Sequence, residues 1–170
     1  IDPKSSLLHH NKNYYLNFSN SYSKEYVFNE HAQFNKVFGD INKKSDVSSY
    51  KNKNGSSKIN IGYVSGDFRQ HSVSYFFLPL LENHNRKQFN IFCYSNNKLS
   101  DEITLKIKTY TKKWIDIFDK SDQEVFEIIK KDKIDILIDL SGHTQGNRLI
   151  VFAKKPAPIQ ITWLGYPNTT

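Results

Sequence analysis

The residues best suited to chemistry lie in one short stretch, residues 65–71, with the sequence SGDFRQH. This stretch places Asp67, Arg69 and His71 between an apolar run typical of a buried strand and an apolar run typical of a helix. A plain connector between two such elements does not need an acid, a base and a histidine. We therefore interpret the turn as part of a site, in which His71 is the candidate general base.

The position of His71 supports a role in proton transfer. The residue directly precedes the helix that we expect to begin near Ser72. The partial positive charge at a helix N-terminus disfavours a protonated imidazole, and a general base must be neutral at the working pH. A histidine that only caps the helix is the structural alternative.

Two further strand ends carry unusual residues, SGHTQG at 141–146 and LGYPNTT at 164–170. In open α/β sheets, ligands bind outside the carboxyl ends of the strands, where the strand order reverses. If the strand order is 3-2-1-4-5, the first and fourth strands are neighbours, and His71 and His143 face one crevice. A loop histidine that hydrogen-bonds a neighbouring turn is the alternative interpretation of His143.

The elements that must position these turns alternate between strands and helices from Lys58 onward. We expect strands at 58–64, 88–94, 114–118, 133–140 and 157–166, and helices at 72–84, 101–113, 122–132 and 147–155. Ser121 is the expected N-cap of the third helix. This pattern predicts an α/β fold, a Rossmann-like doubly wound parallel sheet covered on both faces.

The residues before this domain have a different pattern. Residues 1–38 read as a short helical segment in which Ser23 is a plausible N-cap, and residues 39–57 read as a polar linker. We expect His9, His10 and His31 of the helical segment to lie on the surface. The chain contains no methionine and ends without a cap, which indicates a piece of a longer protein.

Composition excludes several classes. The net charge of +7 comes from scattered lysines, so the sequence favours no nucleic-acid partner. No apolar run approaches the roughly 20 residues that cross a bilayer, so no membrane association is expected. Cys93 is the single cysteine, which excludes an internal disulfide and indicates a reducing, cytoplasmic location with a buried thiol.

Several familiar site motifs are absent. The sequence has neither the G-x-G-x-x-G dinucleotide fingerprint nor a P-loop, and GHTQG lacks the serine of the G-x-S-x-G nucleophile elbow. The six histidines never fall four residues apart with a carboxylate between them, so we expect no metal site.

Taken together, these segments resemble glycosyltransferase family 41, which contains protein O-GlcNAc transferases and SPINDLY-like proteins. GYVSGDFRQHSV at 62–73 and KPAPIQITWLGYPNT at 155–169 are similar to family motifs, and the resemblance covers residues 58–170. Residues 14–34 resemble the family's bridge from tetratricopeptide repeats. The resemblance implies the N-terminal lobe of a two-lobed (GT-B) glycosyltransferase whose C-terminal lobe lies outside this chain.

The resemblance also implies an activity and a set of residues. The expected reaction is inverting, metal-independent and cofactor-free transfer of a sugar, GlcNAc from UDP-GlcNAc, to Ser or Thr hydroxyls of acceptor proteins or peptides. The histidine of the family's D-F-x-x-H motif falls on His71, as the general base. The expected donor-binding residues are Asp67, Gly142, His143, Thr144, Leu164 and Gly165. Gln145 replaces a lysine of the animal enzymes.

Two alternatives remain open from the sequence. The same architecture with GDP-fucose as the donor would make a protein O-fucosyltransferase, and the residues that decide the donor lie in the other lobe. A non-catalytic Rossmann-like binding module is the alternative from another class. Because the site is shared between two lobes, we expect the isolated chain to be inactive.

Overall fold

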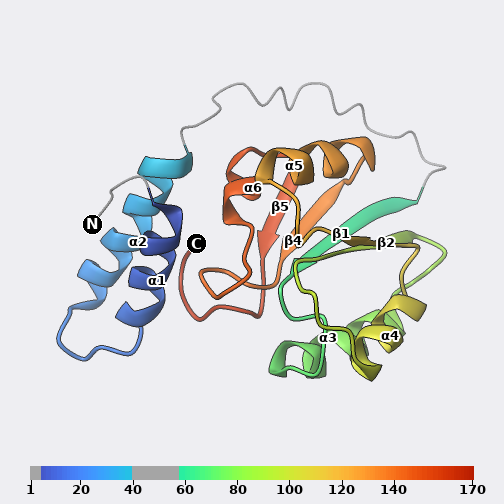
Figure 1. The fold of residues 1–170 in the computed structure, drawn as a ribbon, viewed down its shortest axis with the longest axis horizontal. Helices are drawn as coiled ribbons and strands as arrows, with labels where there is room; N and C mark the ends of the chain where they lie inside the picture. The colour runs from blue at the N-terminus through green and yellow to red at the C-terminus, as the bar shows by residue number, and fades with distance from the viewer. Residues whose placement is uncertain (1–4, 40–57) are drawn as a thin grey trace.

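A five-stranded, fully parallel sheet forms the centre of the computed structural model, which describes residues 5–39 and 58–170 (Figure 1). The strands are β1 (Ile59–Ser65), β2 (Phe89–Ser95), β3 (Lys113–Asp116), β4 (Ile136–Asp139) and β5 (Ile159–Thr162). Their order is β3-β2-β1-β4-β5, with every neighbouring pair parallel. The predicted fold class is confirmed, and the strand order is the 3-2-1-4-5 order under which His71 and His143 face one crevice.

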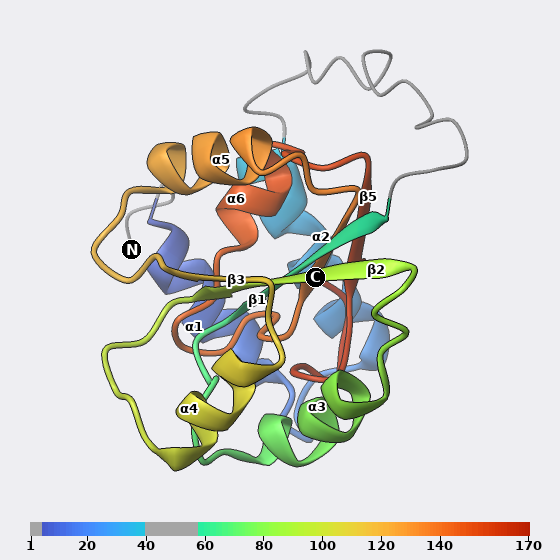
Figure 2. The same cartoon turned by 90° about the vertical axis from the view of Figure 1, so that its right-hand side faces the viewer.

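Helices cover both faces of the sheet (Figure 2). On one face lie α3 (Ser72–Asn83) and α4 (Glu102–Thr109), and on the other lie α5 (Asp122–Lys131) and α6 (Leu149–Ala153). Ser121 caps α5 as predicted, and its hydroxyl accepts a hydrogen bond from the Glu124 amide. The predicted helices at 101–113 and 147–155 extend beyond the observed ones, because strand β3 already begins at Lys113 and α6 spans only five residues.

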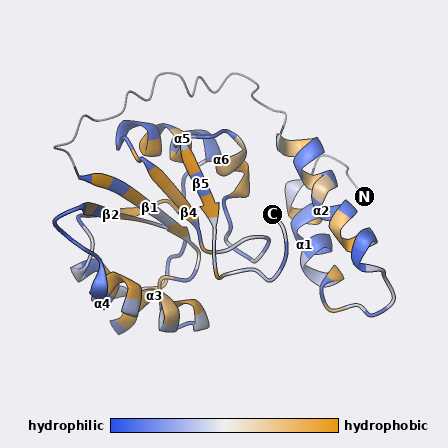
Figure 3. Ribbon diagram, turned by 180° about the vertical axis from the view of Figure 1, so that it is seen from behind, coloured by the Kyte–Doolittle hydropathy of each residue, from blue (hydrophilic) through white to orange (hydrophobic). Residues whose placement is uncertain are grey.

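Two hydrophobic cores lie on the two faces of the sheet, and alternate residues of the inner strands β1, β2 and β4 belong to different cores. Ile61 and Tyr63 of β1 pack toward α3, whereas Val64 packs toward α5 and α6. Cys93 is fully buried on the α3 face, as predicted for a structural thiol. Hydrophobic residues accordingly dominate the strands (Figure 3).

The N-terminal helices α1 (Ser6–Leu16) and α2 (Lys24–Phe38) form a hairpin beside α6 and the end of β5 (Figure 1). Ser23 caps α2 as predicted, accepting from the Tyr26 amide. Phe34 and Phe38 of α2 form a third cluster with Leu149 of α6. The hairpin is therefore packed against the sheet domain. Of the predicted linker 39–57, only Gly39 lies within the described residues.

None of the helices in the described part of the chain is both long enough and apolar enough to span a membrane.

Candidate functional site

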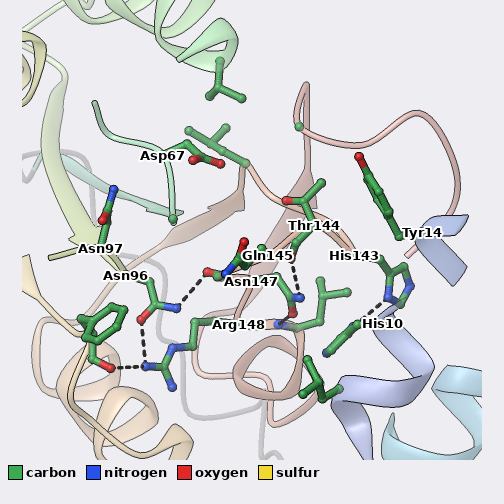
Figure 4. Close-up of a pocket in the computed structure, with 18 of the residues that line it drawn as sticks. His10, Tyr14, Asp67, Asn96, Asn97, His143, Thr144, Gln145, Asn147 and Arg148 are labelled. Atoms are coloured by element: carbon green, nitrogen blue, oxygen red, sulfur yellow. Dashed lines mark hydrogen bonds between the residues drawn. The ribbon is translucent and has the colours of Figure 1, made fainter. Parts of the chain in front are cut away.

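A cleft of about 1050 Å³ opens where the loops after β1, β2 and β4 meet, with α1 as one wall (Figure 4). This is the predicted place, because β1 and β4 are the neighbours at which the strand order reverses. Five predicted residues line the cleft: Asp67, His71, His143, Thr144 and Gly165. The other two, Gly142 and Leu164, belong to the loops that support it.

The loop after β1 is held in shape by its own polar groups. The Asp67 carboxylate accepts from Arg69 Nη2 at 2.9 Å, and the Asp67 backbone amide donates to Ser65 Oγ at 2.9 Å. The buried Ser74 hydroxyl donates to the Arg69 carbonyl at 2.7 Å, which ties the loop to the first turn of α3. The Asp67 carboxylate is therefore charge-compensated and fixed at the cleft wall.

His71 forms the N-cap of α3. Its Nδ1 accepts from the Val73 amide at 3.3 Å and lies 3.9 Å from Asp67 Oδ2. The capping contact expected for a purely structural His71 is therefore present. Because it occupies the lone pair of Nδ1, the neutral ring carries its proton on Nε2. His71 and His143 line the same cleft, but within the described residues no hydrogen bond joins them.

Asp139 organises the loop after β4. Its carboxylate is buried and accepts from the Ser141 amide at 3.0 Å, the Gly142 amide at 2.8 Å and the Thr162 hydroxyl at 3.0 Å. Burial raises the pKa of Asp139 above its ordinary value, although these hydrogen bonds act in the opposite direction. Asp139 thereby sets the path of the chain into His143 and Thr144.

Replacing Asp139 with asparagine should destabilise the folded protein by about 2 kcal/mol, because the new amide group faces donors and leaves a buried donor unpaired. Chemical denaturation monitored by circular dichroism measures the change. Thr162→Val, which removes one donor and leaves the carboxylate in place, is the matched control and should cost less. Equal losses in the two variants would contradict this role of Asp139.

The loop after β5 contains strained backbone at the predicted donor-binding residues. Leu164 adopts a φ of 72°, and the Gly165 amide donates to the Trp163 carbonyl at 2.9 Å, which closes a γ-turn. A Cβ on Gly165 would lie 1.8 Å from the Leu140 carbonyl oxygen. Only glycine fits at this position, which explains in physical terms why the turn has this sequence.

Tyr166 fastens the same loop to the N-terminal hairpin. Its hydroxyl accepts from Asn17 Nδ2 at 2.7 Å, donates to the Asn13 carbonyl at 3.0 Å and is hydrogen-bonded with His31 Nε2 at 2.7 Å. A Cβ on Gly142, whose φ is 55°, would lie 2.2 Å from Tyr166 Cβ. The loops after β4 and β5 therefore touch at this tyrosine.

His143 belongs to a buried aromatic cluster shared with the hairpin. Its Nδ1 lies 2.8 Å from His10 Nδ1, and Asn13 Nδ2 donates to its Nε2 at 3.4 Å. The rings of Phe34, His31 and Tyr166 surround it, with centroids 4.9, 5.3 and 5.3 Å away. The side chain of His143 is therefore hydrogen-bonded to helix α1, and not to a neighbouring turn as in the alternative interpretation.

This cluster corrects one prediction. His10 and His31, expected on the surface, are buried, with exposed fractions of 8% and 1%. Their partners His143 and Tyr166 lie more than 130 positions away in the sequence, so the helical pattern alone gave no signal of them.

The electrostatics of the cluster favour neutral rings. Burial, with smaller contributions from the neighbouring histidines, lowers the pKa of His143 to about 3. Burial and then His9 lower the pKa of His10 to about 4, against a smaller opposite effect of Asp122. Within residues 5–39 and 58–170, no three His, Cys, Asp or Glu side chains are arranged to hold a metal ion.

Two cleft residues were missed by the sequence analysis. Asn96, directly after β2, donates through Nδ2 to the Gly146 carbonyl at 2.9 Å and accepts from Arg148 Nη2 at 2.9 Å. Arg148 also donates to Asp122 at 2.8 Å and to the Ile117 carbonyl at 2.7 Å. The paired asparagines 96 and 97 at a strand end were a usable signal, of the same kind as the other turns.

Comparison with known proteins gives consistent matches. The model of a family described as Glycosyl transferase family 41 matches residues 4–170. The chain is 37% identical over 175 aligned residues to "Probable UDP-N-acetylglucosamine--peptide N-acetylglucosaminyltransferase SPINDLY" of Hordeum vulgare, an alignment that covers 100% of the chain and 18% of that protein. It is also 37% identical over 121 residues to the Arabidopsis thaliana protein of the same description named SEC, covering 71% of the chain and 12% of that protein.

A solved structure supports the same relationship. The structure named "Thermobaculum terrenum O-GlcNAc transferase mutant - K341M" matches with a TM-score of 0.84 and 32% identity, covering 97% of this chain and 31% of that one. The chain thus spans less than a fifth of the barley relative and about a third of the solved structure.

Proposed function

The chain belongs to glycosyltransferase family 41, and on that premise we propose that it forms part of an inverting, metal-independent enzyme that transfers GlcNAc from UDP-GlcNAc to Ser or Thr hydroxyls of proteins. The names of the similar proteins, peptide N-acetylglucosaminyltransferases, support the donor sugar and the peptide acceptor. The observation that carries the proposal is the cleft, at which five of the seven residues expected for catalysis and donor binding meet.

The proposed reaction is a single displacement. The acceptor hydroxyl oxygen forms a bond to the anomeric carbon while the bond from that carbon to the diphosphate oxygen breaks, and UDP leaves on the opposite side. The hydroxyl proton passes to His71, which lines the cleft with its side chain one-third exposed. Asp67, His143, Thr144 and Gly165 form the surrounding wall, and Gly142 and Leu164 hold its loops.

The capping hydrogen bond from the Val73 amide occupies the nitrogen through which His71 must act as a base. In the capped arrangement Nε2 carries a proton, so the ring accepts another only through Nδ1, after the contact with the Val73 amide is released. At 3.3 Å that contact is long for a hydrogen bond, which favours such a release on substrate binding.

Two substitutions separate the base from the cap. His71→Ala removes both functions, whereas His71→Asn removes the base and supplies a side chain that caps helices well. If His71 is the base, both variants of the full-length parent protein should lose roughly 100-fold or more in kcat, the range of general-base contributions. If His71 only caps, His71→Asn should keep near wild-type activity and His71→Ala should lose mainly stability.

The assay offers UDP-GlcNAc and GDP-fucose separately and detects sugar on acceptor proteins by mass spectrometry. Transfer from UDP-GlcNAc alone supports the proposal, transfer from GDP-fucose alone identifies an O-fucosyltransferase, and no transfer from either favours a binding module. Because the chain spans only part of the length of its relatives, and the resemblance divides the site between two lobes, we expect this chain to have no transfer activity by itself. A cytoplasmic location belongs to the same proposal and is supported by the single buried thiol of Cys93. No membrane or nucleic-acid partner is proposed.

A further inference from the structure

His10 of α1 lies at the wall of the cleft and next to His143. It is one of the residues that line the cleft, and its Nδ1 lies 2.8 Å from His143 Nδ1 (Figure 4). Both rings are neutral near pH 7, because burial lowers their pKa values to about 4 and 3. Two nitrogens at this distance must then share a single proton, with one ring donating and the other accepting.

Asn13 decides which ring donates. In the structure the Asn13 amide nitrogen, which can only donate, lies 3.4 Å from His143 Nε2, and Asn13 Oδ1 is buried with no hydrogen-bond partner among the described residues. In this orientation of the amide, His143 Nε2 is the acceptor. The proton of the neutral His143 ring is then on Nδ1 and points at His10 Nδ1. His10 accepts it there, which leaves the proton of His10 on Nε2.

This second nitrogen of His10 is available to a ligand. Within the described residues, His10 Nε2 has no hydrogen-bond partner, while the residue itself lines the cleft. Tyr14, Thr144 and Asn147, which share the cleft wall with His10, are uncharged (Figure 4). Asp122, the carboxylate on this wall whose charge acts on His10, is paired with Arg148 at 2.8 Å. A neutral N–H among neutral polar groups suits an uncharged oxygen and offers no charge to a diphosphate.

We propose that His10 is a substrate-binding residue, whose Nε2–H donates a hydrogen bond to an uncharged oxygen of the substrate, a sugar hydroxyl or carbonyl or a carbonyl of the acceptor. The inference rests on the proposed glycosyl transfer and extends its site to helix α1, outside the sheet domain. His143 and Asn13 act as positioning residues that fix the tautomer of His10.

Two near-isosteric substitutions distinguish binding from packing. Glutamine places its amide nitrogen close to the position of Nε2, so His10→Gln keeps the donor to the substrate and loses the contact with His143. Asparagine places its amide close to Nδ1, so His10→Asn keeps the contact with His143 and loses the donor. His9→Gln and His9→Asn, on the same helix with the ring packed on Phe38, are the matched controls.

For the full-length parent protein, His10→Asn should raise one KM about 3- to 10-fold with kcat within about twofold, as expected for one neutral hydrogen bond. His10→Gln should leave that KM near the wild-type value. A raised KM for UDP-GlcNAc places the oxygen on the donor, and a raised KM for the acceptor peptide places it on the acceptor. The reverse pattern, with His10→Asn unchanged and His10→Gln impaired, overturns the proposal and leaves only a packing role.

A second measurement does not depend on activity. Nitrogen-15 NMR of the imidazole rings, with assignment from the single variants, should show His10 protonated on Nε2 and His143 protonated on Nδ1 at pH 7. The opposite pair of tautomers, which arises if Asn13 turns its oxygen to His143, makes His10 Nε2 an acceptor and overturns the proposal. If the wild-type parent transfers neither sugar, the proposed function fails, and the NMR result still decides the donor at His10.

Discussion

Gly165→Ala should destabilise the folded protein by about 3 kcal/mol or more and remove the activity of the parent enzyme, at the upper end of what overpacking costs. A Cβ at this position would lie 1.8 Å from the Leu140 carbonyl oxygen, 2.4 Å from the Leu140 carbonyl carbon and 2.9 Å from the Ser141 amide nitrogen. All three atoms are backbone, and they belong to the loop after β4. No side-chain rotation relieves the clash, so the loops after β4 and β5 must move apart.

The consequence of that movement extends through the cleft. The loop after β4 carries His143 and Thr144, and the loop after β5 carries Tyr166, whose hydroxyl is bonded to the hairpin at Asn17. Separating the two loops therefore disturbs the cleft wall and the contact of the hairpin together. Gly165→Ala should therefore lower both the midpoint of unfolding and the kcat/KM of the parent enzyme.

Gly66→Ala is the matched control for this prediction. A Cβ on Gly66 would lie 3.1 Å from the Gln145 carbonyl oxygen, a tight contact that a shift of a few tenths of an ångström relieves. We expect a loss of about 1 kcal/mol, at the low end of the range for overpacking. Equal losses for Gly66→Ala and Gly165→Ala in urea denaturation would show that the backbone contact at Gly165 is not the reason for its glycine.

The sequence predicted those parts of the fold that short-range patterns encode. Apolar strands alternating with amphipathic helices specify a parallel sheet, and polar residues at strand ends mark its functional edge. The turn with His71 and the turn with His143 were predicted on that basis, and both line the cleft. The strand order 3-2-1-4-5 entered this argument only as a condition, and the structure has that order.

The rest depends on contacts that no short-range pattern encodes. His10 has the spacing of a surface helix residue, and only the docking of α1 onto the loop after β4 buries it. Helix ends shifted for a related reason, since capping by Asp101 and Thr104 fixes the start of α4 while the pairing of β2 with β3 fixes where the next strand begins. Tertiary contacts determine which helix residues are buried and where a helix ends, whereas helix propensity indicates only the approximate length of the helix.

The buried histidines should make the folded protein strongly sensitive to acid. In the folded state the pKa of His10 is lowered to about 4 and that of His143 to about 3, from an ordinary value of 6.5. Below about pH 6.5 these histidines are protonated in the unfolded chain but remain neutral in the folded protein. Their contribution to the free energy of unfolding is therefore fully present above pH 6.5 and is lost as the pH is lowered toward 4. Each histidine contributes a slope of about 1.4 kcal/mol per pH unit in this window, which is large against a typical stability of about 5–15 kcal/mol.

Other groups act differently in the same range. The half-buried His84 has a lowered pKa and adds to the loss of stability in the same direction. Asp139 acts in the opposite direction, because burial raises its pKa and the folded state gains a proton that the unfolded chain lacks. Four carboxyl groups have pKa values below their ordinary range: Glu30, Glu82, Asp101 and Glu124. Their ionised forms stabilise the folded protein, and this stabilisation is lost only when the pH falls below the ordinary pKa of a carboxyl group. The slope between pH 6.5 and 4.5 is therefore the sum of the histidine contributions and the opposite contribution of Asp139, and comparison with a variant that lacks one histidine isolates the share of that histidine.

His143→Phe tests this assignment, because phenylalanine fits a site already lined by Phe34 and Tyr166. Urea denaturation at half-unit steps from pH 7.5 to 4.5 should show a slope about 1.4 kcal/mol per pH unit smaller than that of the wild type, the share of one histidine. Tyr166→Phe, in the same cluster but with a hydroxyl whose pKa is raised to about 12, should lower stability at every pH without changing the slope. Parallel curves for the wild type and His143→Phe would mean that the acid sensitivity arises elsewhere. A reduced slope would show that the His143 ring is neutral in the folded protein. The proposed hydrogen bond from His143 Nδ1 to His10 Nδ1 requires that charge state.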